Sequence, residues 1–416
     1  MTIRCFCSGA LYELRSLTTH ICAIRLYIPQ ISKLEHNKLI FSKVPTLRFK
    51  QFQDNWSSKR LSDIAEVVGG GTPDTTDSTL WNGGIQWFTP TEVGHSKYVS
   101  MSARTISQLG LQKSSAKILP AGSILLSSRA TVGECSITQK DCTTNQGFQN
   151  LIPKKGINNE FLYYLAQTQK RHFIKYASGS TFLEISNSEI KKTKCAVPSI
   201  EEQTEIATFL SAIDRKIEVQ NKIISKYETL IKGIRERIVN CGWQWKKLDE
   251  LIQEGVVRLN RGNIIPKHPE DNTYKYPVYS SSTQNNGLMG YNDTYMFDKE
   301  LITWSIDGGG NFFYRKKHKF NVTNVCGIMQ VDENVYSYRF IAEMLTYQHS
   351  KMKFDYQSKA HPSVISSLYS LPCLPISEQN SYCRLLIALD RKIQIEQQSL
   401  CKLKEQKKYL LSKMFI

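Results

Sequence analysis

The sequence lacks the short motifs that commonly identify a catalytic site. It has no G-x-x-x-x-G-K-[ST] run, which a P-loop requires, so no ATP motor is recognisable. It also lacks a nucleophile elbow, paired carboxylates at catalytic spacing and an Asn-Pro-Pro-Tyr stretch of the kind that base-modifying amino-methyltransferases use. Together these absences favour a noncatalytic role.

Metal-binding and membrane-spanning patterns are missing as well. The 11 cysteines are scattered, with Cys5 and Cys7 as the only close pair, so neither a disulfide framework nor a zinc site is indicated. The eight histidines are dispersed and form no H-E-x-x-H pair. No apolar run approaches the roughly 18 residues that span a bilayer, because Arg15, Arg25 and Lys33 interrupt the most apolar stretch. We expect a soluble, cytoplasmic protein with no metal site and no membrane partner.

Basic residues outnumber acidic residues. The chain of 416 residues has 54 Lys and Arg against 37 Asp and Glu, which gives a formal net charge of +17 and a pI near 9.3. Such a chain attracts polyanions, and nucleic acid is the commonest of these. Charge alone does not distinguish DNA from RNA or from a membrane surface.

One hexapeptide occurs twice. Residues 212–217 read Ala-Ile-Asp-Arg-Lys-Ile, and residues 388–393, which lie 176 positions later, read Ala-Leu-Asp-Arg-Lys-Ile. Solenoid repeats are only about 20 to 50 residues long, so this period indicates a duplicated module. A Pro, Ser and acidic stretch typical of a helix start precedes each copy, at 198–203 and 375–379. We therefore expect a pseudo-symmetric chain with two long helices.

Both expected helices carry an apolar seam at heptad spacing. A seam kept over more than four heptads favours coiled-coil pairing over packing against a globular core. Each seam contains one polar residue at the equivalent place, which either fixes the register of the pair or is a tolerated surface position near a bend. The seam residues are Leu210, Ile213, Ile217, Gln220 and Ile224 in the first helix, and Leu386, Leu389, Ile393, Glu396 and Leu400 in the second.

The segments between the helices also resemble each other. Each opens with Trp and basic residues, at 56–61 and 243–248. Runs rich in Val, Ile, Thr, Tyr and Trp alternate with Gly-rich turns, so both segments are expected to be mainly strands, with helices at 159–176 and 337–353. The Gly-rich loop at 307–311 lacks the Lys and the Ser or Thr of a phosphate cradle, and a hairpin loop is favoured there. We expect an α+β fold.

At this point several stretches match a known family. Together with the helix starts and the Asp-Arg-Lys-Ile repeats, they resemble the DNA-specificity subunit of type I restriction-modification systems. The resemblance covers about residues 44–416, and the stretches that carry it lie at 47–61, 70–92, 278–287 and 321–327.

The resemblance implies two target-recognition domains held apart by two long helices that form an antiparallel coiled coil. Each domain would read one half of a bipartite double-stranded DNA site. The expected segments are a first target-recognition domain at 44–197, a central helix at 198–240, a second domain at 241–374 and a C-terminal helix at 375–416. Residues 1–43 depart from the family pattern and could reflect an upstream start codon, a fused remnant or an added helix.

The resemblance also implies a division of labour in phage defence. The chain itself would catalyse nothing and bind no cofactor. It would direct adenine methylation by modification subunits and ATP-dependent cleavage by a restriction subunit, and S-adenosylmethionine, ATP and Mg are expected on those partners. Two other classes of function stay open from the residues alone: a generic nucleic-acid-binding module and a coiled-coil scaffold for protein assembly.

Candidate DNA contacts are polar residues in the Gly-rich loops. In the major groove, Arg and Lys read guanine and Asn and Gln read adenine, while Ser, Thr and Lys often contact phosphates. Turns also contain Asn, Ser and Thr for backbone reasons, so each residue has a structural alternative. The candidates are Thr72, Trp87, Thr89, Arg129, Asn145 and Gln146 in the first globule, and Ser281, Ser282, Asn285, Asn286, Asp307, Asn311, Lys359 and His361 in the second.

Overall fold

A computed structural model gives the fold of most of the chain, and it divides into two compact units. Unit 1 runs to Val219 and includes Leu400–Ile416, and unit 2 is Gln220–Ser399. The leader predicted at 1–43 lies outside the described residues except for strand β1 (Leu26–Tyr27), which pairs with β2 (Arg48–Phe49). The structure describes residues 26–27, 44–179, 183–270, 273–282, 284–307, 309–352 and 359–416.

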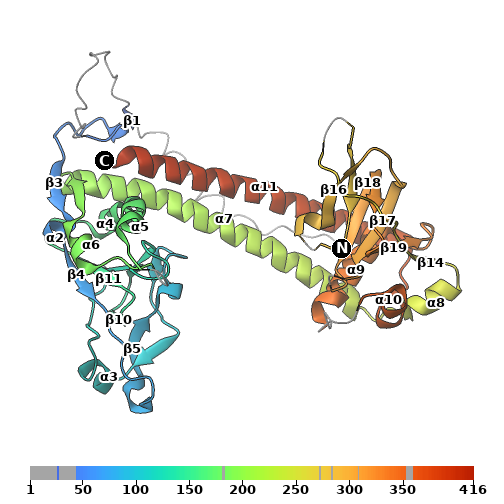
Figure 1. Cartoon of the computed structure of the whole chain (residues 1–416), viewed down its shortest axis with the longest axis horizontal. Coiled ribbons are helices and arrows are strands. Elements are labelled where there is room, and N and C mark those ends of the chain that lie inside the picture. Colours follow the sequence, from blue (N-terminus) through green and yellow to red (C-terminus); the bar gives the residue numbers. More distant parts are fainter. Residues whose placement is uncertain are drawn as a thin grey trace, which may run out of the picture. The chain divides into compact units, whose positions relative to one another are not determined.

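Unit 1 is built around a five-stranded sheet with the strand order β4-β11-β8-β9-β6 (Figure 1). Its neighbours pair antiparallel except β6 and β9, which are parallel. A three-stranded sheet, β10-β5-β7, and the pair β3–β12 complete the strands of this globule. The strands are β3 (Ser57–Arg60), β4 (Ala65–Gly69), β5 (Trp81–Phe88), β6 (Tyr98–Val99), β7 (Arg104–Ile106), β8 (Ile124–Leu126), β9 (Cys135–Thr138), β10 (Cys142–Thr144), β11 (Gln149–Pro153) and β12 (Lys194–Val197).

Short helices cover the unit 1 sheet. The pair α4 and α5 falls where the sequence predicts a helix, and six consecutive buried residues, Phe161 to Ala166, join α4 to the main core. Burial of such a run is the dominant stabilising contribution, because apolar surface leaves water. The short helices are α2 (Leu61–Ile64), α3 (Gln108–Gln112), α4 (Asn159–Thr168), α5 (Lys170–Tyr176) and α6 (Asn187–Lys192), with 3-10 turns η1 (Ser78–Leu80) and η2 (Pro90–Glu92).

Unit 2 contains a six-stranded sheet with the order β14-β19-β17-β18-β15-β16 (Figure 1). All neighbours pair antiparallel except β15 and β18. The loop between β17 and β18 joins antiparallel strands, so the hairpin predicted at 307–311 is confirmed. The strands are β13 (Trp245–Lys247), β14 (Val257–Arg261), β15 (Tyr276–Tyr279), β16 (Leu288–Asn292), β17 (Phe297–Ser305), β18 (Phe312–Val322), β19 (Cys326–Val331) and β20 (Ser370–Pro372).

Three helices and one 3-10 turn accompany this sheet. Helix α9 confirms the helix predicted at 337–353, and its buried residues, among them Phe340 and Leu345, pack into the core of unit 2. Trp304 of β17 is fully buried in the same core. The elements are α8 (Leu248–Gln253), α9 (Tyr338–Lys351), α10 (Pro362–Leu368) and η3 (Gln284–Gly287).

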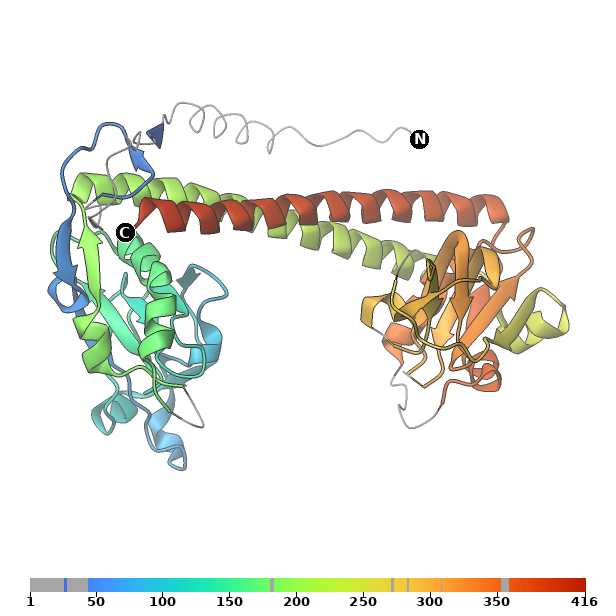
Figure 2. The same ribbon diagram turned by 45° about the horizontal axis from the view of Figure 1, so that its top comes forward.

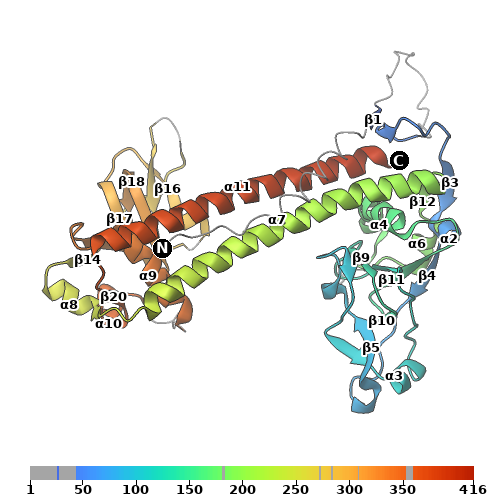
Figure 3. The same cartoon turned by 180° about the vertical axis from the view of Figure 1, so that it is seen from behind.

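The two long helices predicted from the repeats are α7 (Ile200–Asn240) and α11 (Ile376–Met414). In unit 1, Leu210 near the start of α7 shares a core with Leu410 near the end of α11. In unit 2, Ile238 near the end of α7 shares a core with Cys383 near the start of α11. The helices therefore run antiparallel within each unit, and Figures 2 and 3 show them side by side.

The seam residues are the shielded stripe of both helices. All ten of the predicted seam positions are buried or half-buried, and Leu210 and Leu386 are almost completely inaccessible. Val219, which lies off the seam, is 47% exposed. This periodic burial fits helix pairing rather than a helix lying on a broad core. No helix among the described residues is long and apolar enough to cross a membrane.

Candidate functional site

A buried glutamine fastens the start of α7 to the globule of unit 1. The Gln203 side-chain amide donates to the carbonyl oxygen of Pro198 (3.0 Å), and its amide oxygen accepts from the backbone N–H of Asn158 (2.9 Å). Asn158 is the N-cap residue of α4, so one side chain joins the first turns of two helices. Gln203 is only 1% exposed, so these polar groups replace water for each other.

Gln379 does the same work in unit 2, one repeat period after Gln203. Its amide nitrogen donates to the carbonyl oxygen of Leu374 (2.9 Å), and its amide oxygen accepts from the backbone N–H of Ser337 (3.0 Å), the N-cap residue of α9. The duplication is therefore preserved at the level of single hydrogen bonds. Helices α4 and α9 hold equivalent places in the two units.

The aspartate of the repeated hexapeptide makes a second link to the same helices. In unit 1, Asp214 accepts a hydrogen bond from the Tyr164 hydroxyl of α4 (2.6 Å) and forms an ion pair with Lys407 (2.7 Å). In unit 2, Asp390 forms an ion pair with Arg339 of α9. The conserved pattern Asp-Arg-Lys-Ile thus has a structural reason for its aspartate: it holds each globule on its long helix.

A partly buried ionic network surrounds this link in unit 1. The Lys97 ammonium donates to Glu160 (3.0 Å), to the Tyr164 hydroxyl (3.1 Å) and to Ser211 (2.6 Å). Burial lowers the pKa of Lys97, and Glu160 opposes that shift. Burial would raise the pKa of Glu160, but hydrogen bonds from Ser211, Tyr98 and Lys97 outweigh it and hold that pKa below its ordinary value. The network therefore favours an ionised Glu160.

Each globule brings a glycine against the backbone of a neighbouring loop. A Cβ atom at Gly70, directly after β4, would lie 2.0 Å from the carbonyl oxygen of Asn145. A Cβ atom at Gly262, directly after β14, would lie 2.1 Å from the carbonyl oxygen of Val322. Only glycine fits such a close approach. The approach places polar loops beside one another in both units.

We call residues 70–73, 89–92, 128–131 and 145–148 the first loop cluster. Five of the six unit 1 candidates lie in it: the Thr72 hydroxyl bonds to Gln146, the Thr89 hydroxyl donates to Glu92 (2.7 Å), and Arg129 pairs with Glu184 (3.1 Å). Asn145 accepts from the backbone N–H of Gly147 (2.9 Å). Three backbone hydrogen bonds join the loops to each other and to β5 and β10, those of Gly71 to Thr144, Asn145 to Phe88 and Ser128 to Gly147.

Trp87 is the exception, and its prediction as a DNA contact is wrong. The side chain is only 4% exposed, and its indole N–H donates to the carbonyl oxygen of Gly71 (2.8 Å). Its ring packs edge-to-face on Trp81, with 5.0 Å between the centroids. Trp87 therefore supports the first loop cluster from below, because strand β5 turns this side chain into a small core.

The second loop cluster comprises residues 280–282, 284–287, 305–307, 309–311 and 359–361. The Ser305 hydroxyl donates to the carbonyl oxygen of Ser281 (2.6 Å), and the backbone N–H of Ala360 donates to Ile306 (2.9 Å). Lys359 pairs with Asp307 across two of the loops (3.2 Å). All eight unit 2 candidates lie in this cluster, in which Ser282, Asn285, Asn286, Asp307 and Lys359 are exposed and Ser281, Asn311 and His361 are half-buried.

Backbone geometry explains two of these candidates. Asn285 and Asn286 have φ angles of 48° and 51°, in the left-handed region that asparagine tolerates better than most residues. His361 is the N-cap residue of α10, and its carbonyl oxygen accepts from Val364 (2.9 Å). These conformations aim polar groups outward from the turns while leaving the main chain satisfied.

Comparison with known proteins places the chain in a family. The family described as "Type I restriction modification DNA specificity domain" matches residues 53–229 and 240–405. The type I restriction enzyme MjaIX specificity subunit of Methanocaldococcus jannaschii is 41% identical over 224 residues, which cover 48% of this chain and 52% of that protein. The EcoR124I/EcoR124II specificity subunit of Escherichia coli is 27% identical over 203 residues, covering 44% and 50%. The chain spans about half the length of the curated relatives it matches.

Solved structures share the fold. The type I restriction-modification S subunit from M. genitalium superposes with a TM-score of 0.58 at 17% identity, covering 90% of this chain and 99% of that one. A chain from a study of assembly and conformational transition in the type I system gives 0.53 at 13% identity, covering 86% and 97%. The family match covers both repeats of the sequence. The chain therefore belongs to the type I restriction-modification DNA specificity domain family.

Proposed function

We propose that this chain is the noncatalytic DNA sequence-recognition subunit of a type I restriction-modification complex. The observation that carries the proposal is the duplicated attachment, in which Gln203 and Gln379 join equivalent helices to two globules that each carry a polar loop cluster. Two similar readers on one chain suit a bipartite DNA site. A single generic binding module would have no need of a repeated link.

The chemistry of the two loop clusters supports contact with DNA. Asn145, Gln146, Asn285 and Asn286 offer amides that can pair with adenine, and Arg129 can donate to guanine. The net charge of +17 supplies general attraction to phosphates. In this proposal each cluster reads one half-site, and the paired helices set the length of the unread gap between the half-sites.

Partners would supply the chemistry. The names of the relatives place them in type I restriction enzymes, and one structural neighbour comes from an assembled type I system. We accordingly propose that modification subunits and a restriction subunit bind this chain in the cytoplasm as a phage defence. S-adenosylmethionine, ATP and Mg would be bound by those subunits.

Footprinting on random duplexes with the modification subunit present tests the proposal against its alternatives. Protection of a split motif with an unprotected gap of fixed length supports sequence recognition of a bipartite site. Uniform protection would indicate a generic nucleic-acid-binding module, and no protection would indicate a protein-assembly scaffold. As a second readout, the genomic methylation pattern should lose one split motif when the gene is deleted.

A further inference from the structure

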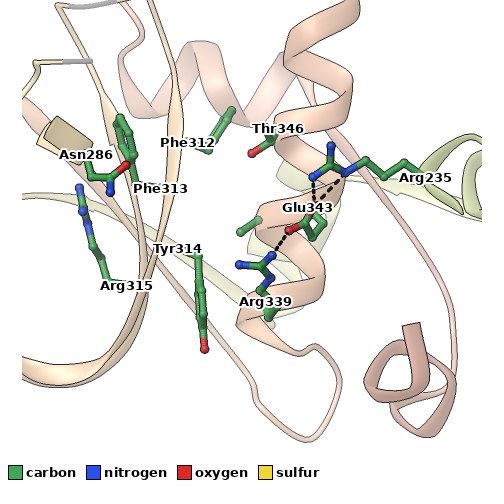
Figure 4. A pocket seen from close by; sticks show the side chains of 10 residues that line it. Arg235, Asn286, Phe312, Phe313, Tyr314, Arg315, Arg339, Glu343 and Thr346 are labelled. Carbon is green, nitrogen blue, oxygen red and sulfur yellow. Dashed lines mark hydrogen bonds and ion pairs between the residues drawn. The ribbon is translucent and has the colours of Figure 1, made fainter. Parts of the chain in front are cut away.

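Unit 2 contains a pocket that the loop clusters do not use in full. It has a volume of about 260 Å³ and lies between strand β18 and helices α7 and α9. Figure 4 shows Arg315 and Asn286 on one side and Arg235, Glu343 and Arg339 on the other. Three guanidinium groups thus line one small space, in which Glu343 is the single lining carboxylate.

Glu343 is fully engaged by two of the arginines. Arg235 donates from Nε to Glu343 (2.8 Å), and Arg339 pairs with the other carboxylate oxygen of Glu343 (2.5 Å). Arg339 also pairs with Asp390 of α11. These ion pairs account for Arg235 and Arg339, and they leave no lining carboxylate for the third arginine.

Arg315 is the third arginine, and it is held firmly while part of it stays unpaired. The residue is only 4% exposed, its Nε donates to the Thr303 hydroxyl (2.9 Å), and its guanidinium lies 3.6 Å from the centre of the Tyr279 ring. Its Nη2 has no hydrogen-bond partner in the described part of the chain. Burial lowers the pKa of Arg315 to about 10, so the group stays charged at neutral pH.

A buried donor without a partner costs free energy, and a buried charge costs more. The turn above it adds a constraint, because a Cβ atom at Gly287 would lie 3.3 Å from Arg315 Nη2. The backbone therefore closes over the guanidinium on that side. The remaining open direction is the pocket, where Arg339 Nε is also without a partner among the described residues.

We infer that this pocket is an anion site that takes a phosphate group. An oxyanion there would accept hydrogen bonds from Arg315 Nη2 and Arg339 Nε, and it would neutralise the surplus positive charge. Guanidinium groups suit this ligand, because their planar donors match phosphate oxygens. The Asn286 side chain, which lines the same pocket, adds a polar neighbour.

The phosphate could belong to a small free anion or to the DNA backbone at the second loop cluster. Both sources present the same oxygen atoms to Arg315. The free-anion source does not depend on the proposed function, because it requires neither DNA nor a partner subunit. Only the DNA source rests on that proposal.

Isothermal titration of the full chain with inorganic phosphate, at constant ionic strength and without DNA, tests the site. We expect saturable binding that falls at least tenfold in Arg315→Met and is unchanged in Lys316→Met, which removes an exposed cation from the same strand. Arg315→Met should fold, because replacing an unpaired buried charge by an apolar side chain of similar length is often neutral or stabilising. Asn286→Ala, in an exposed turn, serves as a second variant and should weaken binding several-fold.

A second arm identifies the source of the phosphate. The titration is repeated on chain saturated with duplex DNA: persistent binding assigns the site to a free anion, and competition assigns it to the DNA backbone. Absence of saturable binding to the DNA-free wild-type chain would overturn the inference. Equal binding by the wild type and Arg315→Met would overturn it too.

Discussion

Gln220 of α7 donates a hydrogen bond to the carboxylate of Glu396 of α11, a residue that lies one full repeat period later in the chain. The same amide donates to the backbone carbonyl oxygen of Glu396 (3.2 Å). The two polar seam residues are therefore partners of each other. This pairing favours the register interpretation of the polar seam positions over that of tolerated surface residues near a bend.

This pair can be tested with a double-mutant cycle. Glu396→Leu should leave the half-buried Gln220 amide without its acceptor and cost about 1–3 kcal/mol in the free energy of unfolding. The combined Gln220→Leu and Glu396→Leu variant should recover most of that loss, because the apolar seam becomes continuous. Urea unfolding of the four proteins measures the coupling, and strictly additive losses would show that the two side chains do not interact energetically.

The apolar seam predicts a strong position dependence for charge. Replacing Ile217 and Ile224 by Asp should cost several kcal/mol, because two unpaired carboxylates enter the interface between the helices. The control is Val219→Asp, since Val219 lies on the same helix but is 47% exposed. Pull-down with the modification subunit and methylation sequencing are the readouts. Unchanged assembly and methylation of the double variant would contradict a packed helix pair.

The Glu160 network predicts a pH dependence of stability. Its folded-state pKa lies below the ordinary value of 4.5, so the unfolded chain binds more protons as the pH falls through that region. The stabilisation from Glu160 should therefore be complete above about pH 5 and be lost at lower pH. Urea unfolding between pH 3 and pH 6 should show a shallower dependence for Glu160→Gln. Glu66→Gln, which removes an exposed carboxylate of β4, should keep the slope of the wild type.

Much of the scaffold could be predicted from the sequence, because its signals are local. Heptad spacing locates the seam residues, and the repeated Asp-Arg-Lys-Ile places both long helices. The Gly-rich turns likewise indicate the β17–β18 hairpin. The division into compact units is less visible, since each unit includes parts of both α7 and α11 rather than ending where a helix begins.

The details of the site depend on contacts between distant residues. Trp87 resembles a loop aromatic in the sequence, but Trp81 and Gly71 enclose it. Gln203 and Gln379 were passed over as parts of acidic helix starts, although their spacing of one repeat period was a signal that could have been used. Arg315 gave no sequence signal, because its isolation depends on which carboxylates Arg235 and Arg339 occupy in the folded unit.

The two loop clusters predict different effects on affinity and specificity. Lys359→Ala should weaken binding to all duplexes and reduce the slope of log affinity against log salt by roughly 0.9, the value for one phosphate contact. Asn145→Ala and Arg129→Ala should cost on the order of 1–3 kcal/mol, mainly on the cognate duplex. Lys299→Ala, at the opposite end of β17 from the cluster, is the control for charge. Fluorescence anisotropy of the assembled complex on cognate and scrambled duplexes measures both effects, and equal losses on the two duplexes would remove Asn145 and Arg129 as base readers.

The most direct measurement concerns the independence of the two readers. Residues 54–196 are replaced by the equivalent region of a relative with a different recognition sequence, and the methylated motif is determined by sequencing genomic DNA from cells with the modification subunit. Our account predicts a new sequence in one half of the motif, with the other half and the gap length unchanged. A change in both halves, or in the gap, would contradict the proposal that each globule reads one half-site by itself.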